Sequence, residues 1–84
     1  MKIYWSGESK NIVGQRVRLL RINQGLSQRA LAEKLQLMGL ECSDLTILRI
    51  ESGKRFVPDY ELRALAEALQ TTYEYLLDGT EAQT

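Results

Sequence analysis

The side chains best suited to binding something outside the chain fall within residues 43–55. Arginine can fork onto guanine or hold a phosphate, and aspartate can accept from the cytosine amino group. The methyl groups of leucine and threonine can touch the thymine methyl group. The residues in question are Ser43, Asp44, Leu45, Thr46, Arg49, Lys54 and Arg55. Their chemistry predicts base contacts from Asp44, Leu45, Thr46 and Arg49 and phosphate contacts from Lys54 and Arg55.

Catalytic and metal-binding chemistry lacks its usual side chains in this sequence. The chain contains no histidine and a single cysteine, Cys42, which argues against a zinc site, a serine–histidine triad and a histidine-activated thiol. No glycine-rich phosphate loop occurs. We therefore expect no enzyme, no metal and no cofactor. A single cysteine cannot form an internal disulfide, which fits the reducing cytoplasm, and the expected role of Cys42 is packing.

Two short helices joined by a turn must position the candidate residues. Ser27 is a good N-cap for the first helix, and Gly39 can take the left-handed conformation that ends it. Ser43 caps the second helix, which Gly53 closes. Two capped helices in succession are the pattern of a helix-turn-helix.

The second helix has an inner and an outer face. Ile47 and Ile50 lie three residues apart and point inward together. At about 100° per residue, Leu45 and Arg49 fall nearly opposite them, with Leu48 on the flank. One alternative is an ordinary helical hairpin with a solvated outer face. Another is a protein partner, because Leu45 and Leu48 suit an apolar contact as well as they suit DNA.

The segments SQRALAEKL, RIESGKRFVPDYELRALAEAL and YLLDGT resemble the Xre and phage-repressor family of helix-turn-helix domains. The resemblance covers roughly residues 11–80. It implies an all-α, compact five-helix domain that binds double-stranded operator DNA, usually as a homodimer. A match to the family motif places Gln28 at a phosphate and pairs Arg21 with Glu51. It puts at the base-reading positions Asp44, Leu45, Thr46 and Arg49.

The spacing between the two helices departs from the family pattern. Counted from Gln28, the turn glycine and the next core aliphatic residue fall late, at Gly39 and Ile47. About five residues are inserted, three of them before the glycine. This spacing predicts that the first of the two helices is longer by about one turn and that the turn itself is also longer.

The rest of the chain predicts three further helices around a single core. Asn11 caps a first helix, a fourth helix follows Pro58, and a short fifth helix ends at Gly79. The expected core comprises Val13, Val17, Leu20, Leu31, Leu35, Ile47, Ile50, Leu62, Leu65 and Leu69. We expect residues 1–10, with Ile3, Tyr4 and Trp5, to form an arm or edge segment, residues 11–80 the domain and residues 81–84 a tail.

The charge is unevenly distributed although the net charge is zero. Residues 1–55 hold ten Lys and Arg against five Asp and Glu, whereas residues 56–84 hold one Arg against six acids. Such a chain can turn a positive face to phosphate, although a merely solvated dipolar surface would have the same composition. No apolar run is long enough for a membrane span. The leading hypothesis is a cytoplasmic, dimeric DNA-binding transcriptional regulator, and the alternative is a protein-interaction module or antitoxin-like adaptor.

Overall fold

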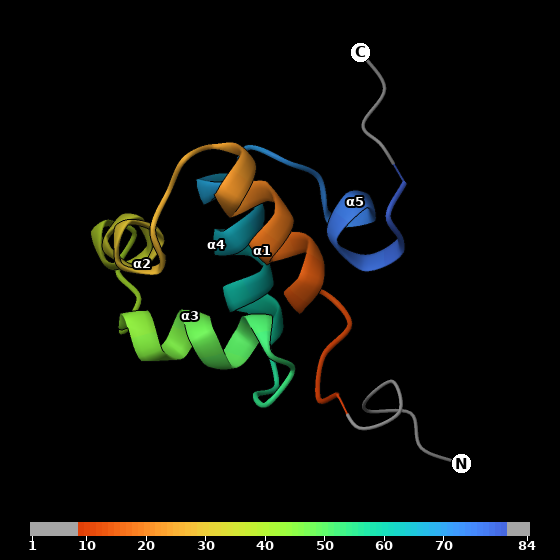
Figure 1. Ribbon diagram of the computed structural model, residues 1–84, viewed down its shortest axis with the longest axis horizontal. Helices are drawn as coiled ribbons and strands as arrows, with labels where there is room; N and C mark the ends of the chain where they lie inside the picture. Colours follow the sequence, from red (N-terminus) through yellow and green to blue (C-terminus); the bar gives the residue numbers. More distant parts are fainter. Residues whose placement is uncertain (1–8, 81–84) are drawn as a thin grey trace.

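The computed structural model describes residues 9–80, and in that part of the chain the regular elements are five helices and no strand (Figure 1). Their bounds are α1 (Gly14–Asn23), α2 (Gln28–Leu37), α3 (Asp44–Glu51), α4 (Asp59–Ala68) and α5 (Tyr73–Asp78). The prediction of an all-α, five-helix fold is confirmed. Neither the apolar cluster at residues 3–5 nor the tail at residues 81–84 lies within the described residues.

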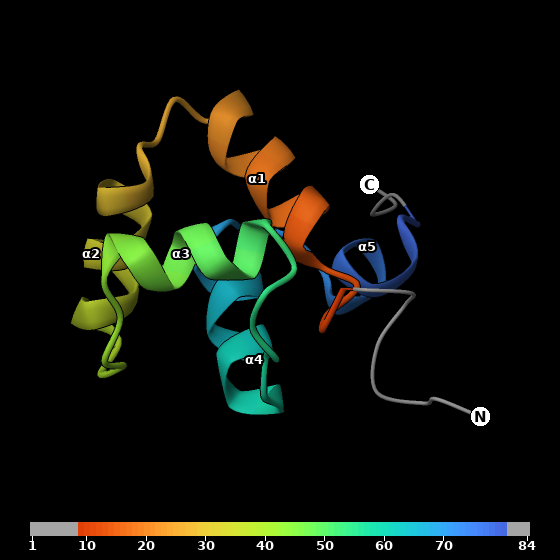
Figure 2. The ribbon, with the colours of Figure 1, turned by 60° about the horizontal axis from the view of Figure 1, so that its bottom comes forward.

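The helices surround one core, with α3 along one side of it. α3 packs against α2 and α1, α2 also packs against α4, and α5 packs against α4 and α1. Figure 2 shows α4 running downward from behind α3, with α2 and α5 on opposite sides of the molecule. None of the five helices is long and apolar enough to cross a membrane.

Local sequence signals account for both ends of α2. The Ser27 hydroxyl accepts from the backbone N–H of Ala30 at 2.9 Å, as a helix N-cap does. Gly39 adopts a left-handed φ of 94°, and the Leu40 N–H returns to the Leu35 carbonyl at 3.1 Å. This Schellman-type ending satisfies the last carbonyls of the helix. α2 has ten residues, and residues 38–43 connect it to α3.

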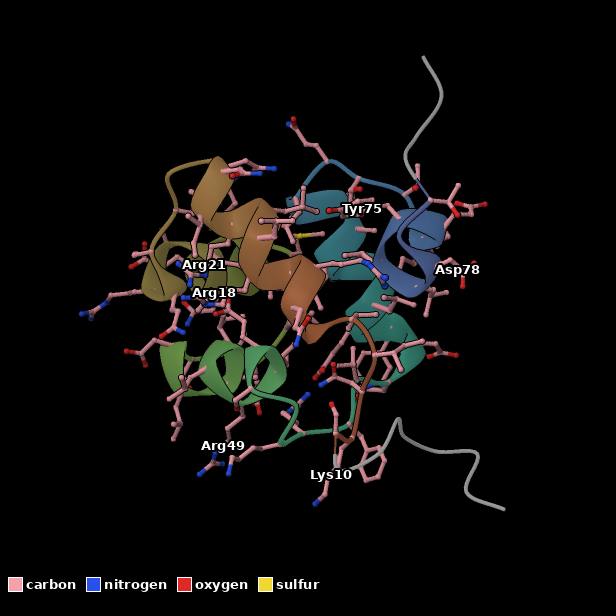
Figure 3. The ribbon with its side chains drawn as sticks, turned by 45° about the vertical axis from the view of Figure 1, so that its right-hand side comes forward. Lys10, Arg18, Arg21, Arg49, Tyr75 and Asp78 are labelled. Carbon is pink, nitrogen blue, oxygen red and sulfur yellow. The ribbon has the colours of Figure 1, made fainter. Side chains whose placement is uncertain are left out.

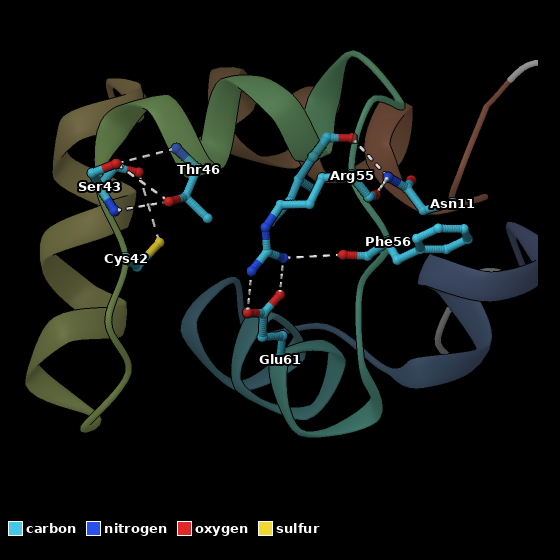
Figure 4. A network of polar contacts seen from close by, with 8 residues as sticks. Asn11, Cys42, Ser43, Thr46, Arg55, Phe56 and Glu61 are labelled. Atoms are coloured by element: carbon cyan, nitrogen blue, oxygen red, sulfur yellow. Dashed lines mark hydrogen bonds and ion pairs between the residues drawn. The ribbon is translucent and has the colours of Figure 1, made fainter.

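The start of α1 corrects one prediction. Asn11 was expected to be the N-cap, but the helix begins at Gly14 and Val13 occupies the cap position without a side-chain cap. The side-chain oxygen Oδ1 of Asn11 nevertheless accepts from the backbone N–H groups of Val13 and Gly14, at 3.1 and 2.8 Å. Its amide nitrogen donates to the carbonyls of Ile50 and Arg55, at 3.1 and 2.8 Å (Figure 4). Asn11 therefore joins the beginning of α1 to the end of α3, which its local sequence context does not reveal.

The core matches its predicted composition closely. Eight of the ten predicted residues are buried, whereas Leu20 and Leu62 are partly buried and pack against the others. The prediction omitted several buried residues. They are Ala32, Ala64, Ala66, Ala68 and Leu76. Four of the five are alanines, whose burial depends on the tertiary arrangement rather than on residue size alone.

Cys42 has the packing role expected of it. Its side chain is partly buried against the core, and its thiol lies 3.8 Å from the Ser43 carbonyl. Burial raises the pKa of the Cys42 thiol, and the nearby charge of Glu61 adds to the effect. A raised pKa leaves less of the reactive thiolate at neutral pH.

The end of α4 contains a residue in an unfavourable conformation, and its replacement gives a prediction. Gln70 has a left-handed φ of 56° and is exposed. A side chain costs about 1 kcal/mol or more in this region, whereas glycine adopts it readily. Gln70→Gly is expected to raise the free energy of unfolding by roughly 0.5–1 kcal/mol, since the greater freedom of glycine in the unfolded chain offsets part of the gain. Urea denaturation measures the change, and a loss of stability would show that the Gln70 side chain contributes more than its strain costs.

Candidate nucleic-acid interface

The outer face of α3 is presented to solvent because its inner face is anchored in the core. Ile47 and Ile50 are fully buried, whereas Leu45 and Leu48 are 47% and 46% exposed. Arg49 is exposed and extends from the same edge of the molecule as α3 in Figure 3. The helix therefore offers a mixed apolar and cationic surface of the kind that the sequence predicts.

The first turn of α3 is fixed by a reciprocal capping box. The Ser43 hydroxyl accepts from the Thr46 N–H at 3.3 Å, and the Thr46 hydroxyl accepts from the Ser43 N–H at 3.2 Å (Figure 4). Asp44 is exposed, and its carboxylate accepts from the Leu45 N–H at 2.9 Å. Both hydroxyls are thus occupied in holding the helix end. The Thr46 methyl group and the remaining oxygen of Asp44 are left for an external contact.

The end of α3 is tied to α1 by an ion pair. Arg21 meets Glu51 through two bonds, Nε to Oε2 at 2.6 Å and Nη2 to Oε1 at 3.1 Å. The two side chains are only 11% and 3% exposed. Arg21 also donates to the Leu26 carbonyl at 2.8 Å. The hydrogen bond that Arg21 donates to Glu51 raises the pKa of Arg21, which favours its charged form.

Gln28 joins this network from the first residue of α2. Its amide nitrogen donates to Glu51 Oε1 at 3.2 Å, so α1, α2 and α3 all meet at one carboxylate. A glutamine amide has two N–H groups, and one of them is therefore still able to reach a ligand. The resemblance implies a phosphate contact for Gln28. The hydrogen bond from Gln28 to Glu51 depends instead on the tertiary structure, and the sequence does not indicate it.

Lys54 and Arg55 have different environments although they are neighbours in sequence. Lys54 is exposed and makes no ion pair with any residue in the range 9–80. Arg55 forms a bidentate ion pair with Glu61, with Nη2 2.8 Å from Oε2, and also donates to the Phe56 carbonyl at 3.0 Å (Figure 4). The hydrogen bonds that Arg55 donates to Glu61 raise the pKa of Arg55. The charge of Arg55 is thus largely offset within the protein.

The charged side chains labelled in Figure 3 do not all lie on one side of the molecule. In Figure 3, Lys10 and Arg49 extend from one edge of the molecule, whereas Asp78 lies on another side. In the described part of the chain, no group of three or more Cys, Asp or Glu side chains is arranged to hold a metal ion.

Comparison with known proteins agrees with this arrangement. A family model described as a helix-turn-helix domain matches residues 12–77. Among solved structures, the chain is similar to the P22 c2 repressor crystallised in complex with a synthetic operator in the presence of Tl+. The two are 28% identical with a TM-score of 0.71, and the match covers 83% of this chain and 98% of that one. No curated protein matches.

The family match covers well over half of the chain. The protein therefore belongs to the helix-turn-helix domain family and has the fold of the phage repressors. α2 and α3 are the two helices of the motif.

Proposed function

We propose that the protein is a sequence-specific DNA-binding transcriptional regulator that inserts α3 into the major groove. The observation that carries the proposal is the outward face of α3, where Leu45 and Arg49 are exposed nearly opposite the buried isoleucines and Asp44 is exposed in the first turn. Recognition helices of this motif contact base edges with side chains near their N-termini. The similarity to a repressor that was solved with its operator supports the same use of this helix.

The proposed contacts divide into two sets. Asp44, Leu45, Thr46 and Arg49 face the bases, while Ser43 caps the helix end that carries them. Gln28, Lys54 and Arg55 contact the phosphate backbone of the DNA and fix the position of the protein on the duplex. Gln28 also lies at the N-terminus of α2, whose free N–H groups and positive dipole end favour a phosphate.

The backbone set is expected to contribute unequally. Lys54 carries a full charge, whereas Arg55 shares its charge with Glu61. Arg55 Nε makes no hydrogen bond with any residue in the range 9–80 and remains available as a donor. Counterion release depends on the net cationic charge brought to the phosphates. Lys54 should therefore contribute more than Arg55 to the salt dependence of DNA binding.

Replacing Arg49 and replacing Lys54 by alanine should therefore weaken DNA binding in different ways. Lys54→Ala should weaken binding to all duplexes alike and reduce the slope of log affinity on log salt by about 0.9. Arg49→Ala should cost about 1–3 kcal/mol of binding free energy at the preferred site and little on a scrambled duplex. A site is first selected from a random DNA pool, and fluorescence anisotropy titrations then measure each variant on both duplexes.

The wild-type protein is the reference for these titrations. Sequence enrichment in the selection is the result expected of a specific regulator. If the wild-type protein neither enriches a sequence nor shows a negative salt slope, the proposal is wrong. If Arg49→Ala behaves like Lys54→Ala on both duplexes, Arg49 is not reading a base.

We further propose that the protein binds a two-fold operator as a homodimer. The surface formed by α4 and α5 supports this proposal, because Tyr60 and Tyr73 are 61% and 48% exposed there and Leu77 lies beside them. These three side chains and Leu62 line one open cavity. A dimer formed through this surface would present two copies of α3, and half-sites about 34 Å apart would match them.

The second candidate function is a protein-interaction module that retains the fold. It is favoured by the half-exposure of Leu45 and Leu48 on the outer face of α3, since exposed leucines also suit a protein partner. The two candidates differ in salt dependence, because only phosphate contacts release counterions.

A further inference from the structure

We propose that Lys10, which precedes the helix-turn-helix, is an additional phosphate-contacting residue and forms one basic site with Lys54. This inference rests on the proposed function and extends its binding surface to the segment before α1. The observations that carry it are the attachment of residues 9–11 to the end of α3, the environment of the Lys10 side chain, and the pairing of Arg55.

Residues 9–11 are fastened to the loop that follows α3. The Lys10 N–H donates to the Gly53 carbonyl at 2.7 Å. The Asn11 amide bridges the carbonyls of Ile50 and Arg55. Gly53 faces Ser9 so closely that a Cβ atom there would collide with the serine side chain. Because several backbone groups of the loop take part, the position of Lys10 is set by the end of α3 rather than by α1 alone.

The Lys10 side chain is directed outward beside this loop. Its ammonium lies 5.7 Å from the centroid of the Phe56 ring, within the range of a cation–π contact. Lys10 is exposed and makes no ion pair with any residue in the range 9–80. In Figure 3 it extends from the same edge of the molecule as Arg49. A full positive charge is therefore held, with limited freedom, on the side proposed to face DNA.

The pairing of Arg55 explains why a cation from outside the motif matters here. The sequence places two cations after α3, but Glu61 offsets the charge of Arg55. Lys54 then remains as an exposed cation without an ion-pair partner in the described part of the chain. Lys10 lies against the same loop through Gly53 and Phe56. It supplies the second charge with which the loop can engage the phosphate backbone.

The test compares Lys10→Ala and Lys10→Gln with Lys10→Arg in the full chain. Both neutral variants keep the backbone N–H that binds Gly53, and circular dichroism melting curves check their folding. Binding to the selected duplex and to a scrambled duplex is measured by anisotropy across a salt series. Lys34→Ala is the matched control, because Lys34 is an exposed lysine six residues beyond Gln28 on α2, about 9 Å along the helix from the proposed phosphate contact.

Both neutral variants should weaken binding about 3- to 10-fold at low salt on both duplexes and reduce the salt slope by about 0.9. Lys10→Arg and Lys34→Ala should leave the slope unchanged. An unchanged slope in Lys10→Ala and Lys10→Gln, measured beside a reduced slope in Lys54→Ala, overturns the inference and leaves the proposed function standing. If the wild-type protein binds neither duplex, the proposed function fails and the role of Lys10 fails with it.

Discussion

Gly14→Ala is expected to lower the free energy of unfolding by about 3 kcal/mol or more, beyond the usual 1–3 kcal/mol of an overpacked core. The first residue of α1 lies directly against the end of α3. A Cβ atom on Gly14 would fall well inside the contact distance of the Ile50 carbonyl oxygen and 3.1 Å from the Glu51 carbonyl oxygen. Backbone atoms cannot rotate away as a side chain can, so α1 and α3 would have to separate.

The sign of this change is itself informative. Replacing glycine by alanine within a helix ordinarily stabilises it by about 1 kcal/mol, so a loss of stability at Gly14 reports the interhelical contact. Gln15→Ala is a suitable control, because it changes the exposed neighbour in the same turn. Urea denaturation of both variants gives the comparison. A Gly14→Ala protein as stable as the wild type would mean that the two backbones are not in contact in solution.

The sequence indicated the helices well where their limits depend on local interactions. The caps at Ser27 and Ser43, and the left-handed conformation at Gly39, involve groups within a few residues of one another. Such interactions can be read from spacing, because a capping hydroxyl bonds an N–H only two or three residues ahead. The inward direction of Ile47 and Ile50 follows from helical periodicity in the same way.

The contacts that the sequence did not indicate join segments far apart in the chain. Gly14 is required because the Ile50 carbonyl approaches it, which no pattern within α1 signals. Asn11 was expected only to cap α1, yet it also binds the carbonyls of Ile50 and Arg55.

The candidate site likewise depends on a contact that the sequence does not indicate. Lys54 and Arg55 have equivalent charges in the sequence, and Glu61 differs from the other acids of the C-terminal half only through its position beneath Arg55. Five residues, among them Pro58, lie between Arg55 and Glu61, so helical spacing does not apply to the pair. Which cation remains available for an external contact is therefore decided by tertiary structure.

The Arg21–Glu51 ion pair gives the second large expected effect. Arg21→Ala should destabilise the protein by about 3 kcal/mol, because removing one partner of a buried pair leaves an uncompensated charge. Glu51 would then keep only the bond from Gln28 within a side chain that is 3% exposed. Glu51→Ala should cost somewhat less, since Arg21 is 11% exposed and keeps its bond to the Leu26 carbonyl.

A double-mutant cycle measured by urea denaturation separates the pair from its surroundings. The combined loss in Arg21→Ala/Glu51→Ala should fall short of the sum of the single losses by about 1–3 kcal/mol, because both single variants remove the same interaction. Arg29 and Glu33 provide the internal control, as an exposed pair 3.9 Å apart one turn along α2. That cycle should give a coupling below about 0.5 kcal/mol. Strict additivity at Arg21 and Glu51 would show that the pair does not hold α1 to α3.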